Sequence, residues 1–330
     1  MTYTTTPKSA SRITEPTRPR VRRGAIGKNG AGRPRNTRRS RRGIVLAYLV
    51  IAPTLLVMLV FLVYPFVQGL IQSLFRYNGG NVNVFIGLDN FFSLADDAIF
   101  RQSVLNGLLV TAFTVTVTTC VPLLVAWLVH HFYSPRLKYA YRFLVMVPVV
   151  VPGAVVILIS GRILKGDGVL NTVLRQMGLG QFAQNWLTDG SIVLLGIMLV
   201  GFPYLIGVYC LLYLGALGAI PRELYEAAQL DGAGRSGVFK HVELPAVAGQ
   251  IRIIVTLGIV QGLQAYDTIY ILTKGGPNDA SVVPGIVLFK QGFSYGQFGM
   301  ANAVGVSIML ITLAILGIGL LATKIGTRRG

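Results

Sequence analysis

Three polar side chains stand close together within an apolar part of this sequence. Gln261, Gln264 and Thr268 recur at three- and four-residue spacing among Ile, Val and Leu residues, which places them on one face of a helix. Amides and hydroxyls are costly in an apolar environment unless they are hydrogen-bonded, so this stripe should face protein or a water-filled cavity. A carboxamide offers both a donor and an acceptor, which suits a sugar-like solute with many hydroxyl groups. The stripe therefore predicts either a solute site or hydrogen bonds between neighbouring helices.

Four more side chains extend this predicted substrate pathway. Tyr266 and Asp267 stand nearer one end of the same stretch, where they could gate a cavity. Tyr204 and Tyr209 lie in the preceding apolar run and are weaker candidates, since an aromatic ring can stack on a sugar ring.

Residues suited to catalysis or metal binding are few and scattered. His130 and His131 adjoin the end of one apolar run and His241 lies in a polar loop, and we expect no catalytic carboxylate to pair with them. Cys120 and Cys210 fall inside apolar runs, away from any Cys or His at metal-ligand spacing, which argues against a disulfide framework or a zinc site. The sequence also has no Gly-rich phosphate loop with its Lys. We therefore expect no enzyme, no metal site and no cofactor bound by this chain.

The longest polar loop, residues 218–248, has the pattern of a short helix. Pro221 and Glu223 favour a helix start and Gly232 favours a helix stop, so we expect about three turns between them. One face of this helix repeats at three- and four-residue spacing and is mostly small, because it is formed by Leu224, Ala227, Ala228 and Asp231. Glu226 stands at the edge of that face. Small side chains allow another surface to approach closely, and the alternative is an ordinary amphipathic helix that lies on the membrane surface.

The elements that must position these residues are membrane helices. Of the 330 residues, 53% are hydrophobic and 13% are charged, a balance too apolar for a soluble domain of this size. A hydrocarbon core of about 30 Å requires about 20 helical residues, and lipid offers backbone groups no hydrogen-bond partner. Residues 43–330 are thus predicted to form an all-α membrane domain with six transmembrane helices: Ile44–Leu70, Leu105–His130, Phe143–Ser160, Ile192–Leu217, Ile251–Leu272 and Ala301–Ala322. Pro148, Pro152 and Gly153 should kink or break the third of these helices.

Charge is concentrated at the N-terminus. Residues 1–42 hold 13 of the 30 Lys and Arg, with Glu15 as the only acid, so they account for +12 of the net charge of +18. This tail lacks apolar residues that could offset the entropy of ordering it, and we predict that it is disordered and cytoplasmic. A tail of this kind is typical of a topology anchor that touches anionic lipid, and we favour that role over nucleic-acid binding.

Lys and Arg in the loops predict the orientation. With the N-terminus inside, the segments on the cytoplasmic side hold 23 of the 30 basic residues, and the longer outer loops hold 7. Basic residues are retained on the cytoplasmic side of a membrane. We therefore expect both termini in the cytoplasm, with the chain spanning a cell membrane.

The polar loop resembles the signature loop of the permease subunits of binding-protein-dependent ABC importers. The match runs through Glu226-Ala227-Ala228, Gly232, Val242 and Leu244-Pro245, with one unspecified position between Val242 and Leu244. Val242 is a mild departure, because this family usually has Ile there. The resemblance implies a type I ABC importer permease fold and a coupling helix that sits in a cleft of a cytoplasmic ATPase subunit. By this resemblance, the ATPase-coupling residues are Glu226, Ala227, Ala228, Asp231, Gly232, Leu244 and Pro245.

A second stretch, residues 266–277, resembles the end of the fifth span and its outer loop in the sugar-importing, maltose-type members of this family. In that class the fifth span helps to line the solute cavity. The resemblance implies partners: a second homologous permease, two ABC ATPase subunits that hold ATP and Mg²⁺, and an extracytoplasmic binding protein that delivers a sugar-like solute. Transport then follows alternating access driven by the ATPases.

Two other functions compete with this interpretation. A membrane enzyme would need catalytic groups clustered at one depth, which the scattered histidines do not provide. An ion-coupled secondary transporter or a channel would bury several ionisable groups near the middle of the membrane, whereas only Asp267 qualifies here, and it stands toward the outer end.

Overall fold

The computed structural model describes residues 41–132, 134–200 and 202–327. The chain divides into two compact units, residues 1–57 and residues 58–330. The described part of the first unit, residues 41–57, lies on helix α1 (Arg41–Met58). Helix α1 therefore begins within the predicted tail of residues 1–42, which is a correction for Arg41 and Arg42. The prediction of a disordered tail otherwise falls outside the described residues.

Long apolar helices build the second unit. After a π-helical turn η1 (Leu59–Val63) and α2 (Tyr64–Gln72) come α4 (Ala98–Phe132) and, at the end of the chain, α16 (Phe298–Thr327). Helices α4, α9 (Phe202–Gly218) and α13 (Ala248–Leu263) pack side by side. At Gly262 a Cβ atom would lie 2.5 Å from Thr111 Cα, so the glycine permits a close approach of α13 and α4. Small residues at such contacts are typical of membrane helix packing.

The third predicted span is broken at its prolines. Helices α5 (Pro135–Val150) and α6 (Gly153–Ile163) meet at an angle of 88°. Pro152 stands directly before α6 and has no N–H to continue the helical hydrogen bonds of α5. The break at these residues is confirmed, and it is sharper than an ordinary proline kink.

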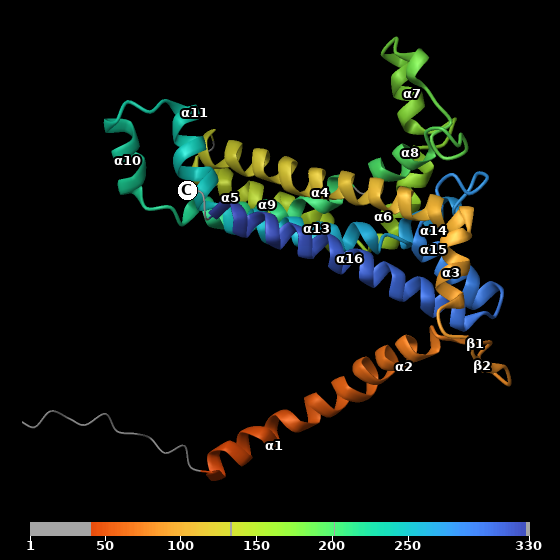
Figure 1. Ribbon diagram of the computed structural model, residues 1–330. Helices are drawn as coiled ribbons and strands as arrows, with labels where there is room; N and C mark the ends of the chain where they lie inside the picture. The colour runs from red at the N-terminus through yellow and green to blue at the C-terminus, as the bar shows by residue number, and fades with distance from the viewer. Residues whose placement is uncertain (1–40, 133, 201, 328–330) are drawn as a thin grey trace, which may run out of the picture. The chain divides into compact units, whose positions relative to one another are not determined.

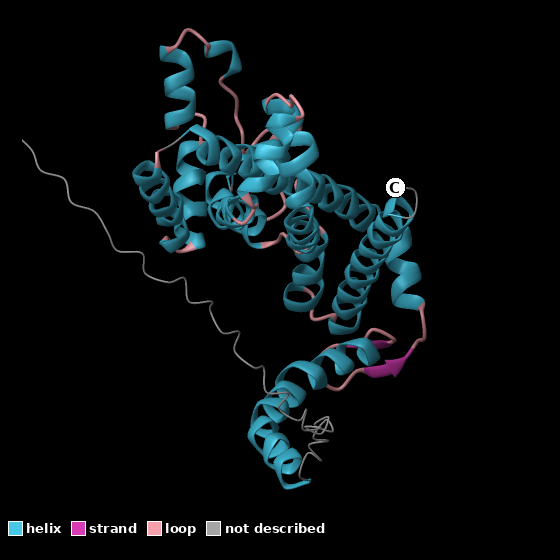
Figure 2. Ribbon diagram, turned by 90° about the vertical axis from the view of Figure 1, so that its left-hand side faces the viewer, coloured by secondary structure: helices cyan, strands magenta, loops and turns pink. Residues whose placement is uncertain are grey.

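Short elements cap the two ends of the bundle. At one end lie the antiparallel hairpin of β1 (Phe75–Tyr77) and β2 (Asn83–Phe85), with Phe75 opposite Phe85. The same end holds α3 (Asp89–Asp96), α7 (Val169–Gln176), α8 (Val193–Val200), α14 (Asp267–Thr273), α15 (Pro284–Phe289) and the turns η2 (Gly180–Phe182) and η4 (Lys290–Ser294). The opposite end holds α10 (Arg222–Leu230), α11 (Arg235–Val238), η3 (Phe239–Glu243) and α12 (Leu244–Ala246). Figure 2 shows that, in the described residues, the hairpin is the one sheet among helices.

Each end has its own buried core. Toward the hairpin, Val193, Ile197, Ile269, Ile286 and Val304 pack together from α8, α14, α15 and α16. Toward α10, the fully buried side chains come from α4, α9 and α13 and the turn before α13, and include Val129, Tyr213, Val247 and Ile254. These two cores hold the ends of α4 in fixed surroundings, since protein interiors are close-packed.

Six spans are not confirmed. Within the described residues, three helices are long and apolar enough to cross a membrane alone: Tyr48–Gln72, Ala98–His131 and Phe298–Leu321. The number rises to five if two bent pairs count as one span each, namely Tyr139–Val150 with Gly153–Ile163, and Arg235–Ala246 with Ala248–Thr273. The fourth predicted span, Ile192–Leu217, is divided into α8 and α9, with residue 201 outside the described part. Its longest apolar helix, Ile206–Gly218, is too short to cross by itself.

Candidate functional site

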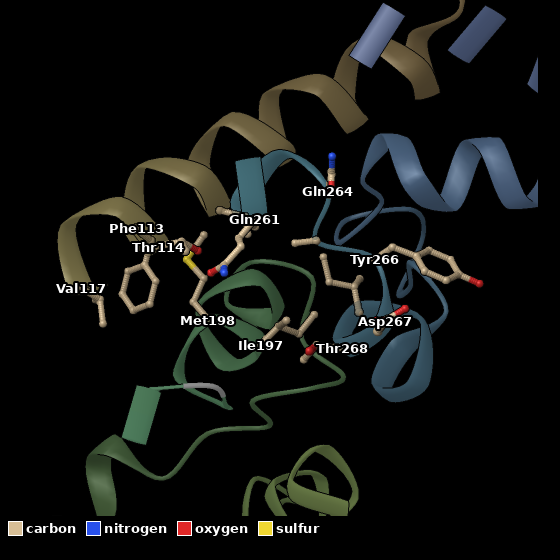
Figure 3. Close-up of a pocket in the computed structure, with 13 residues that line it drawn as sticks. Phe113, Thr114, Val117, Ile197, Met198, Gln261, Gln264, Tyr266, Asp267 and Thr268 are labelled. Atoms are coloured by element: carbon tan, nitrogen blue, oxygen red, sulfur yellow. The ribbon is translucent and has the colours of Figure 1, made fainter. Parts of the chain in front are cut away.

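A cavity of about 390 Å³ lies where α13 ends, between α4 and α8 (Figure 3). All five predicted pathway residues of the fifth span line it: Gln261, Gln264, Tyr266, Asp267 and Thr268. Apolar and hydroxyl side chains from α4 and α8 complete the wall, among them Phe113, Thr114, Ile197 and Met198. A largely apolar pocket with a few convergent polar groups is the usual form of a small-molecule site.

The fifth span is interrupted beside this cavity. Helix α13 ends at Leu263 and α14 begins at Asp267, so residues 264–266 are not helical. The prediction of a stripe along one continuous helix is therefore wrong in its geometry, although the same residues share one wall. In Figure 3 the Gln261 side chain points toward Met198, whereas the Tyr266 ring points away from both of these residues.

Gln261 is already hydrogen-bonded within the protein. The Tyr209 hydroxyl on α9 donates to Gln261 Oε1 over 3.0 Å. This bond joins two helices, as expected if the polar stripe serves helix packing, yet it leaves the Gln261 amide N–H₂ group as a donor. Tyr209 is buried and is not one of the residues that line the cavity, so it reaches the predicted pathway only through this bond to Gln261. Tyr204 lies on α9 where side-chain positions are not described.

Other predicted residues differ in their surroundings. Gln264 is exposed and lines a second cavity, of about 310 Å³, with Thr312 and Met309 of α16. The Tyr266 ring stacks on Tyr270, with ring centroids 5.2 Å apart, and both rings contact Phe289. Asp267 stands in the first turn of α14. The aromatic contacts hold Tyr266 at the wall, a position that suits the predicted gate.

Sequence reasoning missed the walls that α4 and α8 contribute. Ile197 and Met198 stand in an apolar 8-residue helix that has no polar pattern to single them out. Thr114 stands in the 35-residue α4, where Thr111, Thr114 and Thr118 recur at three- and four-residue spacing, a signal that sequence reasoning did not use. Their role depends on helix packing between distant segments, which local spacing does not show.

The short helix predicted in the polar loop is present as α10. It covers Arg222–Leu230, begins directly after Pro221 and has Glu223 in its first turn. Gly232 has a φ of +76°, and the chain reverses there with a hydrogen bond from Ala233 N to Ala228 O of 2.9 Å. A left-handed residue, usually glycine, is a common way to end a helix. Glu226 and Ala227 are exposed on α10, and Figure 1 shows α10 standing off the end of the bundle.

The rest of the motif continues into the bundle. Leu244 and Pro245 form α12, and the helical segment Arg235–Ala246 meets Ala248–Thr273 at 64°. Beside them stands Glu243, a fully buried carboxylate that sequence reasoning did not single out. Its Oε1 lies 3.1 Å from His131 Nε2, so one of the three histidines has a carboxylate partner that the sequence did not predict. Burial and the nearby Glu243 carboxylate both raise the pKa of the Tyr225 phenol.

Sequence comparison supplies the class of this protein. Residues 118–326 match the family described as the binding-protein-dependent transport system inner membrane component. Among similar proteins is the probable ABC transporter permease protein YurN of Bacillus subtilis, which is 31% identical over 273 residues, or 82% of this chain and 93% of the relative. The diacetylchitobiose uptake system permease protein NgcF of Streptomyces coelicolor is 30% identical over 308 residues, or 89% of this chain and 86% of NgcF.

Solved structures give the same fold. A bacterial alginate ABC transporter in complex with alginate pentasaccharide-bound periplasmic protein aligns with a TM-score of 0.75 at 23% identity, covering 88% of this chain and 98% of the other. The architecture is therefore the type I ABC permease fold, as the signature loop predicted. The chain belongs to the family of binding-protein-dependent transport system inner membrane components.

Proposed function

We propose that this chain is one of two permease subunits in an ATP-driven importer of a sugar or sugar-like solute. The observation that carries the proposal is α10, an exposed helix with the family signature at one end of the bundle, whose α4 and α13 also line a cavity. Relatives named for diacetylchitobiose and arabinooligosaccharide uptake support a carbohydrate solute. The Gln261 and Gln264 carboxamides suit such a solute, because each can donate and accept hydrogen bonds.

The partners follow from the family. A second permease completes the translocation pathway, an extracytoplasmic binding protein delivers the solute, and two ATPase subunits hold ATP and Mg²⁺. This chain itself binds no cofactor and catalyses no reaction. Closure of the ATPase pair displaces α10, and the helix bundles rock to open the cavity outward, so that access alternates between the two sides.

The proposed placement is the bacterial inner or plasma membrane, with both termini and α10 in the cytoplasm. The last helix, α16, runs from the hairpin end of the bundle back toward the end that holds α10 and α11 (Figure 1). Six crossings satisfy this placement if each broken helix pair, including α8 with α9, crosses once. The excess of basic residues in the same segments favours this side for the cytoplasm.

Charge reversal at Glu226 tests the coupling. In purified complex in liposomes, Glu226→Lys should abolish uptake and remove the stimulation of ATP hydrolysis by loaded binding protein, while membrane insertion stays normal. By resemblance to the family, Glu226 pairs with a basic residue of the ATPase subunit, and a lysine in its place would repel that residue, because like charges in contact are unfavourable. The matched control is Lys240→Glu, a charge reversal at an exposed position of the same loop outside the signature.

Each result decides between defined alternatives. Wild-type uptake and stimulation by Glu226→Lys would contradict the coupling assignment. Uptake that continues without ATP and follows an ion gradient would identify a secondary transporter instead. Loss of activity in Lys240→Glu to the same degree would mean that the loop responds to any charge change, and the specific role of Glu226 would fail.

A further inference from the structure

A buried carboxylate joins three elements at the α10 end of the bundle. Glu243 is the last residue of η3 and has an exposed fraction of 0%. Trp127 Nε1 of α4 donates to its Oε2 over 2.8 Å, and the Tyr225 hydroxyl of α10 donates to its Oε1 over 3.1 Å. His131 Nε2 of α4 lies 3.1 Å from the same Oε1. Both carboxylate oxygens therefore have partners, as a buried charge requires.

The His131 ring lies between two oxygen atoms. Its Nδ1 lies 3.0 Å from the Trp127 carbonyl oxygen, and its Nε2 lies 3.1 Å from Glu243 Oε1. Each ring nitrogen is therefore within hydrogen-bonding distance of an oxygen, one of α4 itself and one of Glu243. The side chain of His131 is 24% exposed, so the ring borders solvent while Glu243 does not.

Tyr225 is the point where α10 meets this carboxylate. On α10 only Tyr225 and Ala228 are half-buried, and the other residues of the helix are exposed. Besides its hydrogen bond to Glu243, the Tyr225 ring stacks on His130 of α4, with centroids 6.5 Å apart. A push on α10 can therefore pass through Tyr225 into α4 as well as through the short connections at the ends of α10.

Helix α4 links this cluster to the cavity. Trp127 and His131 stand near its C-terminal end, and Phe113 and Thr114 of the same helix line the cavity. The 13 residues from Thr114 to Trp127 correspond to about 20 Å of helix at 1.5 Å per residue. Helix α4 is packed against α9 and α13, and close-packed interiors transmit strain, so a displacement at its C-terminal end can reach the residues that line the cavity.

We infer that Glu243 is a positioning residue that ties the coupling helix α10 to α4, so that displacement of α10 moves the wall of the cavity. The inference rests on the proposed function and adds a specific route to it. Glu243 occupies the unspecified position between Val242 and Leu244, so the family signature does not assign this role. Coupling between sites requires an element that both sites move, and the Glu243 cluster with α4 supplies one.

The test uses the complete complex with its ATPases and loaded binding protein in liposomes. Tyr225→Phe removes only the hydroxyl and keeps the ring on His130, and Glu243→Gln removes the charge but keeps most of the shape. Each variant should lower the number of solutes imported per ATP hydrolysed by about fivefold or more, the lower end of a typical coupling effect. Combining the two should add little, because both break the same link. Tyr139→Phe, at an exposed tyrosine of α5, is the matched control.

The outcomes separate this inference from the proposed function. A wild-type ratio in Tyr225→Phe and in Glu243→Gln, together with uncoupling by Glu226→Lys, would overturn the Glu243 link and leave the coupling loop in place. If Glu226→Lys also keeps a wild-type ratio, the proposed function itself fails. A lower ratio that appears only when the ATPases dissociate would also overturn the inference, since that result indicates simple loss of assembly. Should Glu243→Gln not fold, Tyr225→Phe still decides.

Discussion

Residues with polar groups in apolar sequence could be recognised without a structure, but their partners could not. Gln261 and Gln264 stand out by type and spacing, and both line the cavity. Their difference is visible only in three dimensions, since Tyr209, 52 positions away, donates a hydrogen bond to Gln261, while Gln264 lines two cavities. The same limit applies to Glu243, whose donors come from α4 and α10. Hydrogen bonds between distant segments follow from packing, which local spacing does not determine.

Truncation of the two carboxamides should change solute selection. Gln261→Ala and Gln264→Ala each remove hydrogen bonds worth about 1 kcal/mol, so uptake kcat/KM should fall about fivefold. The preference among competing sugars should change as well, because sugars that differ in the arrangement of their hydroxyl groups form different hydrogen bonds with the two carboxamides. Kinetics of uptake in liposomes measure both effects, and the affinity of the binding protein for its sugar must be unchanged. Thr116→Ala, at an exposed hydroxyl of α4 that bonds only to its own helix, is the control. Unaltered kinetics for every sugar would make both residues structural and place the site in the partner permease.

Elements were predictable where a residue type interrupts the helix. Pro152 accounts for the break between α5 and α6, and Pro221 with Gly232 marks the ends of α10. The break at residues 264–266 has no proline within it, so apolar composition predicted one continuous span there. In a continuous helix, Gln264 and Asp267 would lie on regular turns after α13. Because the helix is broken there, they line the cavity from a non-helical turn and from the start of α14.

Two glycines that follow α10 should respond differently to substitution by Asp. Gly232 has a φ of +76°, where a side chain costs roughly 1 kcal/mol or more. Gly232→Asp should therefore displace α10 and lower coupled uptake by about fivefold or more, while the chain still inserts. Gly234 has a φ of −71° at the N-cap of α11, where Asp is favoured. Gly234→Asp carries the same charge change, and equal loss of uptake in both variants would contradict a conformational cause. The ratio of uptake to ATP hydrolysis measures the effect.

At the scale of the whole molecule, the chain separates its tasks between two ends. The end with α10 carries the signature residues and the Glu243 cluster, and the end with the hairpin carries α3, α7 and α15 (Figure 1). Loop charge predicted which loops share the cytoplasmic side, and that orientation stays a prediction. The number of crossings was not predictable from apolar length alone, because α5 with α6 and α8 with α9 divide their spans. A broken helix leaves backbone groups that protein or water must satisfy, so its surroundings decide whether it crosses.

The basic N-terminal segment should be dispensable for transport. Removal of residues 1–38 takes away ten of its 13 basic residues but leaves Arg39, Arg41 and Arg42 beside the first apolar run. Basic residues next to a transmembrane helix keep the adjoining segment in the cytoplasm. The shortened chain should therefore insert correctly and import at the wild-type rate. Replacing the three arginines by alanine in the shortened chain should instead misplace the N-terminus, which labelling of an added terminal cysteine from either side would detect. If the shortened chain inserts normally at normal abundance and yet loses uptake, the segment must bind a partner needed for transport, and its role as a topology anchor alone would be wrong.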